Sequence, residues 1–466
     1  MATKKQKKKA INTAKKVAKK KPLLVVFLLL LVIGAGVAVI VLFNMGVFDK
    51  FIKKSDAQPT GTTGTQQVEP SVSGEIEKHE AEDGFSENIV YNNLQIHFME
   101  LGNKYTGDST YIKAGDTDIL IDAGSRSNSS TTLVNYVKQY CTDGKLEYVI
   151  ATHSHQDHIA GFAGTSDTKA TNFKNEKVGK TGVLYYFEVG TLIDFAYKGE
   201  KSAAVDNKTA KSSDYGASTE YGKYLAAREY AISKGAKYYT AKELWDNNNT
   251  TFTLAEGITM DILYNYFYFN AASNENDYSV CTMFNYNDKH FLLTGDLEHD
   301  GEEKLANYYE KNLPHCELFK GGHHGSYTAS NECLLEKITP SICCVCCCAG
   351  ATEYTPNSNN QFPSQDFINR IAKYTSRVYI TTLFNEETLK NESMNGNIIV
   401  SFNGESVGIN ASNNLTRLKD TAWFNADIYV DSSGNNVSKK GNEEFYTSET
   451  PNVTKVKRRT WPANGV

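Results

Sequence analysis

The sequence predicts an α/β domain preceded by one transmembrane helix, and three observations support this. Short β-type segments alternate with helical ones between residues 89 and 411, which is typical of α/β folds. An uncharged apolar run extends from Leu23 to Phe43. A dense polar motif, HSHQDH at residues 153–158, directly follows a predicted strand. Together these features indicate a membrane-attached globular domain whose loops carry the chemistry.

The N-terminal segment predicts a membrane anchor. Residues 23–43 form a helix of about 31 Å, which is long enough to cross a bilayer. Residues 1–22 carry ten Lys and no acidic residue, so we expect a cytoplasmic tail and a domain outside the cell. A cleaved signal peptide is the alternative. The run is long for one, and no small-x-small cleavage site directly follows it.

Residues 44–88 predict a flexible linker. They are rich in Thr, Gly, Gln and Pro and then become acidic, a composition that cannot bury a core. The chain has a net charge of −5, but outside residues 1–22 it has 39 basic residues against 54 acidic ones. The extracellular part therefore lacks the broad basic surface of a tight nucleic-acid binder.

A single globular domain is predicted over residues 89–411. Strands are expected near residues 94–101 and 146–152, and two short strands joined by a turn at Gly115-Asp116 are expected over 111–122, followed by a helix at 131–140. Residues 164–255 are polar and are interpreted as an insertion with one helix at 221–233. Strands near 280–296, 316–320, 342–348, 377–382 and 397–402 alternate with helices near 301–311, 332–338 and 362–374. Residues 412–466 are predicted to be an irregular C-terminal tail.

The HSHQDH motif predicts a metal site. It places three imidazoles and one carboxylate in six positions. A tight loop could let His153 and His155 hold one cation while Asp157 and His158 hold a second. Such ligands suit zinc, with manganese or iron as alternatives. We therefore expect two divalent metal ions.

Two later segments add ligand candidates at predicted strand ends. Asp296 in LLTGD could bridge two cations through its two oxygens, although helix capping is an alternative because a helix follows. His323 and His324 lie in KGGHHGS, where His324 is the favoured ligand and His323 the second candidate. Lys320 and Ser326 are candidates for contacting the substrate, with surface or loop-capping roles as the alternative.

The cysteine cluster CCVCCC at residues 343–348 is interpreted as a buried strand. Cys343 and Cys346 have metal-type C-x-x-C spacing, but adjacent residues of a strand point to opposite faces. We therefore expect Cys to serve here as a small apolar residue. Free thiols in an exported protein suggest an anaerobic setting.

HSHQDH, the Asp of LLTGD and KGGHHGS, in this order, resemble the metallo-β-lactamase superfamily. More narrowly, they are similar to the metallo-hydrolase domain of ComEC-type competence proteins and related bacterial surface hydrolases. The resemblance spans roughly residues 94–403 and implies an αββα sandwich with the metals at one rim of the sheets. It implies that the signature loop, a bridging Asp296 and the paired His supply the ligands. It also implies that Asp122 supports the site and that Gly107-Asp108-Ser109 and Lys320 match family positions.

The sequence departs from the family pattern in three places. The loop LGNKYTGDS is longer, the signature HSHQDH lacks the commoner proline and alanine, and residues 164–255 are an insertion. No His lies between residues 159 and 289, where zinc β-lactamases, glyoxalases and tRNA-processing relatives place a ligand. The ComEC-like group lacks that ligand, so the resemblance argues against a β-lactamase and implies open positions on the first metal.

Three functions follow as hypotheses. The favoured one is a metal-dependent phosphodiesterase that acts on nucleic acid or a phosphorylated wall polymer, with Asp157 orienting the attacking hydroxide. The alternatives are a hydrolase of esters, lactones or phosphorylcholine esters, and a non-catalytic surface binding module of the same fold. A complete ligand set disfavours the last.

Overall fold

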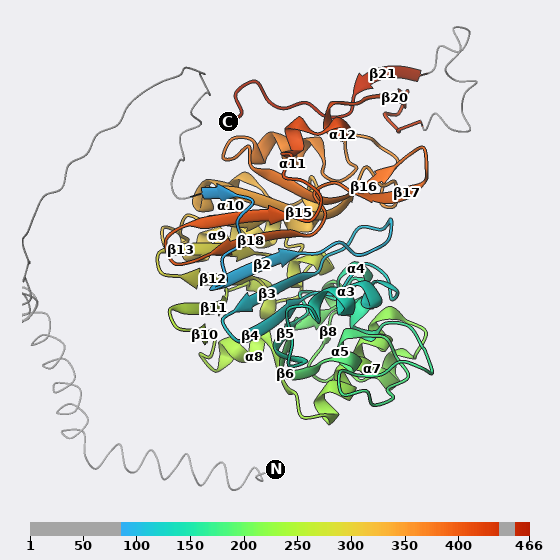
Figure 1. Cartoon of the computed structure of the whole chain (residues 1–466), viewed down its shortest axis with the longest axis vertical. Helices are drawn as coiled ribbons and strands as arrows, with labels where there is room; N and C mark the ends of the chain where they lie inside the picture. The colour runs from blue at the N-terminus through green and yellow to red at the C-terminus, as the bar shows by residue number, and fades with distance from the viewer. Residues whose placement is uncertain (1–84, 438–452) are drawn as a thin grey trace, which may run out of the picture. The chain divides into compact units, whose positions relative to one another are not determined.

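The computed structural model describes residues 85–437 and 453–466, and within them two large sheets dominate (Figure 1). The first sheet has nine strands, in the spatial order β1 (Phe85–Glu87), β19 (Val407–Ala411), β18 (Ile398–Phe402), β2 (Leu94–Phe98), β3 (Thr110–Ala114), β4 (Thr117–Ile121), β5 (Lys145–Ile150), β6 (Glu188–Asp194) and β9 (Lys237–Thr240). Strands β19 through β4 pair antiparallel, whereas β4, β5, β6 and β9 run parallel.

The second sheet has eight strands. Their order is β10 (Thr251–Ala255), β11 (Ile258–Ile262), β12 (Thr282–Tyr286), β13 (Lys289–Leu293), β14 (Leu318–Lys320), β15 (Ile342–Ala349), β16 (Val378–Asn385) and β17 (Lys390–Ser393). Strands β13 to β16 are parallel and the outer strands are antiparallel. Parallel strands end at the same edge of a sheet, so the loops that follow β13, β14 and β15 meet there.

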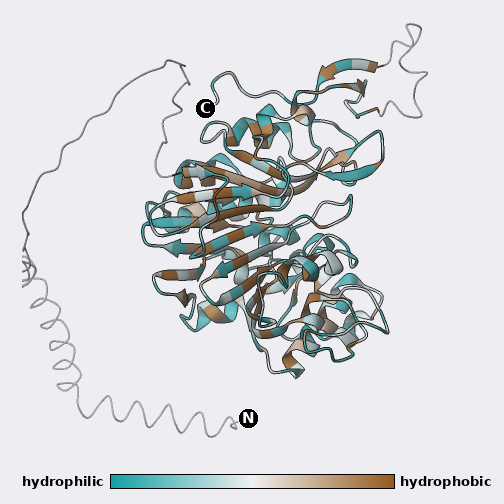
Figure 2. Cartoon of the chain, viewed as in Figure 1, coloured by the Kyte–Doolittle hydropathy of each residue, from teal (hydrophilic) through white to brown (hydrophobic). Residues whose placement is uncertain are grey.

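The two sheets pack face to face, with helices outside each. The rings of Phe291 on β13 and Phe402 on β18 lie 5.9 Å apart in the shared core. Apolar residues recur along the strands of both sheets, whereas the connecting loops are mostly hydrophilic (Figure 2). The arrangement is the αββα sandwich that the family resemblance implies.

The helices divide between the two outer faces. The first core cluster includes side chains from α3 (Ser129–Val137), α4 (Gln156–Ala163), α5 (Val183–Tyr186), α7 (Glu220–Ser233) and α8 (Ala241–Asp246). A second cluster covers the other face of the second sheet with α9 (His299–Tyr309), α10 (Glu332–Ile338), α11 (Gln365–Ile371) and α12 (Ala422–Asn425). Helix α6 (Ser212–Tyr215) and the two-stranded sheet of β7 (Tyr197–Lys198) and β8 (Val205–Asp206) complete the region before β9.

The cysteine-rich segment forms β15, and all eight of its residues are buried. Cys344 and Cys346 join the core between the sheets, while Cys343 and Cys347 join the cluster under the outer helices. The two members of the C-x-x-C spacing therefore face opposite sides of the sheet. The structure supports the apolar interpretation of these thiols.

Two expectations about domain organisation need correction. The segment interpreted as an insertion contributes β6 and β9 to the first sheet and β10 to the second, because its short strands pair with sheet edges. The predicted irregular tail includes η6 (Leu418–Asp420), α12 and the paired strands β20 (Asp427–Asp431) and β21 (Val453–Lys457). Arg459 is buried there and donates to the carbonyls of Gln361 and Pro363, which attaches this segment to the domain.

The predicted transmembrane segment, residues 23–43, lies outside the described residues, as do the Lys-rich tail and nearly all of the linker. Within the described ranges, no helix has both the length and the apolar character that a bilayer crossing requires.

Candidate metal centre

The HSHQDH loop begins where β5 ends. His153 follows that strand, His155 caps the N-terminus of α4, and Asp157 and His158 occupy the first helical turn. A carboxylate in the first turn is stabilised by the helix dipole. The loop packs tightly on its neighbours. A Cβ at Gly124 would lie 1.5 Å from the carbonyl oxygen of Asp157, so this approach requires glycine.

The second sheet brings its candidates to the same place. Asp296 follows β13, and His323 and His324 lie in the 3-10 turn η5 (Gly322–Gly325) after β14. Both histidines have positive φ, 43° and 55°, so the chain turns sharply and presents the two adjacent imidazoles to one site. The sequence motifs of the two sheets therefore converge at one rim of the sandwich.

Four imidazoles surround one oxygen of Asp296. The Nε2 atoms of His158, His324, His323 and His153 lie 3.0, 3.3, 3.8 and 4.0 Å from its Oδ2. Asp157 joins the group, because its Oδ2 lies 3.3 Å from the His324 Nε2. Ligand atoms gathered in this way around a central carboxylate suit cations that share that carboxylate.

The residues fit a divalent cation on two further grounds. Ligand atoms of Asp108, His158, Asp296 and His324 all lie within 4.8 Å of one another, and all four residues are buried. Asp296 Oδ1 and His324 Nε2 are buried and have no hydrogen-bond partner among the residues that the structure describes. Buried polar atoms seldom lack partners, and a metal ligand atom is one explanation. The fit extends to the chemistry, since imidazole and carboxylate are ligands of zinc, manganese and iron.

The buried carboxylates of the cluster also favour a positive charge beside them. Burial raises the pKa of Asp296, but His158, His324 and His323 outweigh it, so the pKa lies well below its ordinary value. Burial lowers the pKa values of His158 and His324, yet Asp296 and neighbouring carboxylates raise both well above the ordinary value. The buried carboxylates thus draw protons onto the imidazoles, and a cation could replace those protons.

Asp122 orients His158. Its Oδ2 lies 2.7 Å from the His158 Nδ1, which turns Nε2 toward Asp296. Asp122 also accepts hydrogen bonds from the backbone N–H and the hydroxyl of Thr152, at 2.8 and 2.7 Å. Such outer partners fix the tautomer and direction of a ligating imidazole. The supporting role that the family resemblance implies for Asp122 agrees with this geometry.

Lys320 lies deeper than a simple substrate contact would require. Its side chain is buried, and its Nζ lies 2.5 Å from Asp108 Oδ2 and donates to the Gly295 carbonyl at 3.2 Å. Asp108 in turn lies 3.3 Å from the Nδ1 of His324, which also reaches the carbonyl of Cys346 at 2.9 Å. Lys320 thus neutralises a carboxylate beside the last ligand pair, and its contact with substrate stays a prediction.

Two other candidates lie at the margin of the cluster. His155 Nδ1 is 3.0 Å from His153 Nε2, so one cation could take both nitrogens as ligands. The hydroxyl of Ser326 lies 2.9 Å from that of Thr328, which is itself 3.1 Å from the Nδ1 of His323. Ser326 therefore lies in the network that supports His323, and its catalytic role is untested.

Three contributors were absent from the predicted site. Asp108 was noted only as part of the G-D-S loop, which was the signal that could have identified it. Glu298, whose Oε1 lies 3.0 Å from the His323 Nδ1, and Tyr354, which donates to Asp157, lie in segments without a motif. Only the folded chain brings these residues to the cluster.

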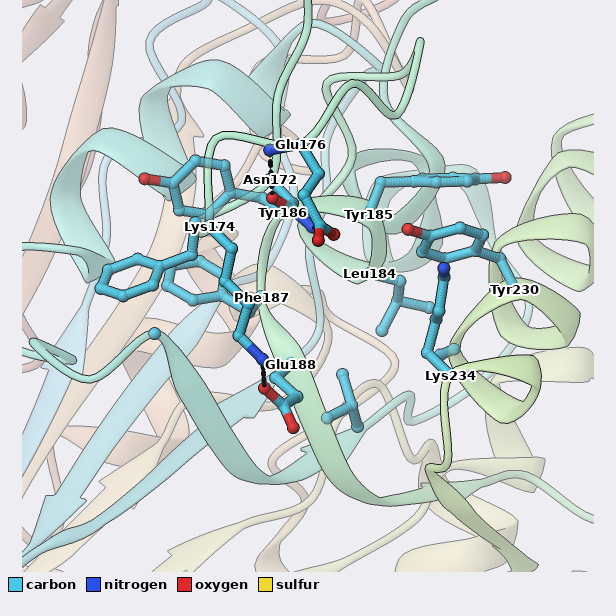
Figure 3. A pocket seen from close by; sticks show the side chains of 14 residues that line it. Asn172, Lys174, Glu176, Leu184, Tyr185, Tyr186, Phe187, Glu188, Tyr230 and Lys234 are labelled. Atoms are coloured by element: carbon cyan, nitrogen blue, oxygen red, sulfur yellow. Dashed lines mark hydrogen bonds and ion pairs between the residues drawn. The ribbon is translucent and has the colours of Figure 1, made fainter.

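A separate hollow lies in the region between β5 and β9 (Figure 3). It has a volume of about 140 Å³ and is partly walled by aromatic rings, with those of Tyr185 and Tyr230 4.5 Å apart. Lys174 and Glu188 on its rim form an ion pair of 2.7 Å. None of the metal-cluster residues lines it, so it is distinct from the metal centre.

A family model described as the metallo-beta-lactamase superfamily matches residues 102–170, which include Asp108, Asp122 and the whole HSHQDH motif. Residues 102–170 are therefore similar to this superfamily. Its members are mainly metal-dependent hydrolases, and the buried His/Asp cluster of this domain can bind metal. The narrower likeness to ComEC-type proteins stays a prediction.

Several solved structures are similar to this chain at low identity. The metallo-beta-lactamase fold protein YhfI from Bacillus subtilis is 9% identical with a TM-score of 0.32, over 62% of this chain and 95% of that one. Human tRNase Z, short form, is 12% identical with a TM-score of 0.26, over 62% and 92%. A diphosphatase of the PhnP family is 11% identical with a TM-score of 0.27, over 54% and 85%. No curated protein matches the chain.

Proposed function

We propose that this protein is a metal-dependent phosphodiesterase held at the outer face of the cell membrane by residues 23–43. Its substrate is nucleic acid or a phosphorylated wall polymer. The observation that carries the catalytic part is the convergence of four imidazole nitrogens on Asp296 Oδ2, because a carboxylate shared by two cations is typical of hydrolytic two-metal sites.

The ligands divide between two cations in this proposal. His153, His155 and Asp296 would hold the first, and Asp157, His158, Asp296 and His324 the second, with His323 as the alternative to His324. Bound there, divalent cations would supply Lewis acidity for hydrolysis of a phosphoester.

The protein's own residues prepare the site. Asp122 holds His158 with its Nε2 toward Asp296, and Lys320 compensates the charge of Asp108 in a buried position. These buried contacts keep the ligands preorganised, so little rearrangement is needed when substrate arrives. Asp157 lies where it can orient an attacking water.

The substrate assignment rests on charge and topology. The acidic balance beyond residue 22 is a poor fit to tight binding of DNA, so in this proposal the phosphate is bound through the metal centre and not through a basic surface. Phosphodiesters in a wall polymer would be accessible to a domain outside the membrane.

The function is tested with the detergent-solubilised full chain, loaded in turn with zinc, manganese and iron. We expect cleavage of bis-p-nitrophenyl phosphate by wild type and none by Asp296→Asn, with single-stranded DNA and a phosphodiester-linked wall polymer as larger substrates. Cleavage of lactones, carboxyl esters or phosphorylcholine esters without any phosphodiester would instead establish the alternative hydrolase.

The location is tested separately on intact cells. A wall-permeable protease added outside should remove the catalytic domain and leave residues 1–43 with the membrane. Complete protection of the domain would contradict the proposed topology.

A further inference from the structure

A strap of chain, residues 350–362, connects β15 to the segment before α11 and lies against the metal cluster. Phe362 at its end has its ring centroid 5.7 Å from those of both His323 and His324. The strap is therefore in contact with the paired histidines of the second sheet.

The same strap also contacts the loops of the first sheet. Glu353 accepts a hydrogen bond from the backbone N–H of Thr106 at 3.1 Å, two residues before Asp108. Glu353 also forms an ion pair with Arg126, which donates to Gln156 within HSHQDH at 3.1 Å. The strap thus joins the metal-site loops of both sheets.

Tyr354 lies on this strap between those two attachments. Its hydroxyl donates to Asp157 Oδ2 at 2.5 Å, and its ring lies 5.3 Å from that of Phe362. Tyr354 is 49% exposed, whereas Asp157 is buried. The phenol therefore extends from solvent to the carboxylate oxygen that also faces His324.

The hydroxyl of Tyr354 is a hydrogen-bond donor that can change its acceptor. Its single O–H can serve one acceptor at a time and can rotate between two. A cation bound by Asp157 Oδ2 weakens that oxygen as an acceptor, and an anionic substrate at the cluster brings a stronger one. Lys320 cannot take this role without leaving Asp108, since it is buried and paired there.

We propose that Tyr354 is a substrate-contacting residue, whose hydroxyl donates to Asp157 in the free enzyme and to a phosphoryl oxygen of the bound substrate. This inference rests on the proposed phosphodiesterase function and names the group that the strap recognises, a phosphate oxyanion at the mouth of the metal centre. In this step the hydrogen bond from Tyr354 to Asp157 breaks and the one to the phosphoryl oxygen forms, and no covalent bond changes.

The test compares Tyr354→Phe with the control Tyr308→Phe in the metal-loaded full chain. Tyr308 on α9 is 51% exposed, so the two substitutions remove one hydroxyl from tyrosines of equal exposure. The measurements are metal content, the melting temperature, the affinity for inorganic phosphate by calorimetry, and kcat/KM on bis-p-nitrophenyl phosphate.

We expect Tyr354→Phe to bind phosphate about 10- to 100-fold more weakly than wild type, as for the loss of one hydrogen bond to a charged group. Its kcat/KM should fall by a similar factor, with metal content and melting temperature unchanged. Tyr308→Phe should match wild type in every measurement.

Two results would overturn the inference. One is a phosphate affinity within about twofold of wild type at full metal content. The other is a loss of metal from Tyr354→Phe that accounts for the weaker binding, because the hydroxyl would then only position Asp157. If wild type binds phosphate through Tyr354 but cleaves no phosphodiester, the proposed function fails and this inference stands.

Discussion

Asp157 lies in one segment, the HSHQDH loop, and is contacted by a second, the strap at residues 350–362, and the two differ in how the sequence specifies them. The HSHQDH loop places four candidate ligands in six consecutive residues, and its geometry follows from one strand end and one helix start. The strap at residues 350–362 contributes one hydroxyl from 197 residues further along the chain. The comparison shows that ligands with a characteristic local spacing can be identified in a sequence. A contact that forms only through tertiary packing cannot.

The largest effect should come from the carboxylate at the centre of the cluster. Asp296→Ala removes the oxygen that four imidazoles face, so we expect loss of at least one metal ion and a fall in activity of about a thousandfold or more. Elemental analysis and turnover measure both. The matched control is Glu336→Ala on the exposed side of α10, and unchanged metal in Asp296→Ala would refute the assignment.

A smaller loss should follow when an orienting residue is changed. Asp122→Asn keeps the size of the side chain but weakens its hold on His158 Nδ1, so metal affinity should fall about 10- to 100-fold. Competition with a chromogenic chelator gives the affinity. If Asp122→Asn binds metal as tightly as wild type, Asp122 serves the fold and not the site.

Lowering the pH should weaken metal binding gradually, to an extent comparable with the effect of Asp122→Asn. Asp296 and neighbouring carboxylates raise the pKa values of His158 and His324 well above 6.5 despite their burial, so a cation must displace protons to bind them. Affinity should therefore increase with pH through neutrality, by about tenfold per pH unit for each proton displaced, until the imidazoles are neutral. The same chelator competition at several pH values measures this slope, and a flat profile would contradict it.

The smallest effect on the site should come from β15. Cys346→Ala and Cys347→Ala each leave a small cavity in a buried strand, so unfolding free energy should fall by about 1–3 kcal/mol. Metal content should not change. Denaturant unfolding with elemental analysis tests both statements, and metal loss would restore the C-x-x-C interpretation.

The sequence predicted those parts of the fold that have strong local patterns. The hairpin around Gly115 and the helix ECLLEKI form as expected, because turn residues and apolar periodicity specify them. β6 and β9 lie in a largely polar stretch and are only partly buried, so no clear apolar pattern identified them in the sequence. β20 and β21 are separated by many residues and become strands only by pairing with each other.

The site shows the same division. His153, His158, Asp296 and His324 were all named from motifs, and the structure brings them together. Glu298 and Tyr354 act through contacts with residues far away in the chain, so no spacing could reveal them. The predicted substrate contact of Lys320 illustrates a further limit, because sequence cannot show whether a charged side chain will be buried.

The burial of β15 gives the protein an internal reporter of opening. Eight of the nine cysteines of the protein are buried free thiols, and only Cys333 is partly accessible. A bulky thiol reagent should modify Cys333 first. It should modify the buried cysteines only when the two sheets of the sandwich separate. The rate of that second phase would measure how often the whole domain opens under native conditions, with the protein's own thiols as the label.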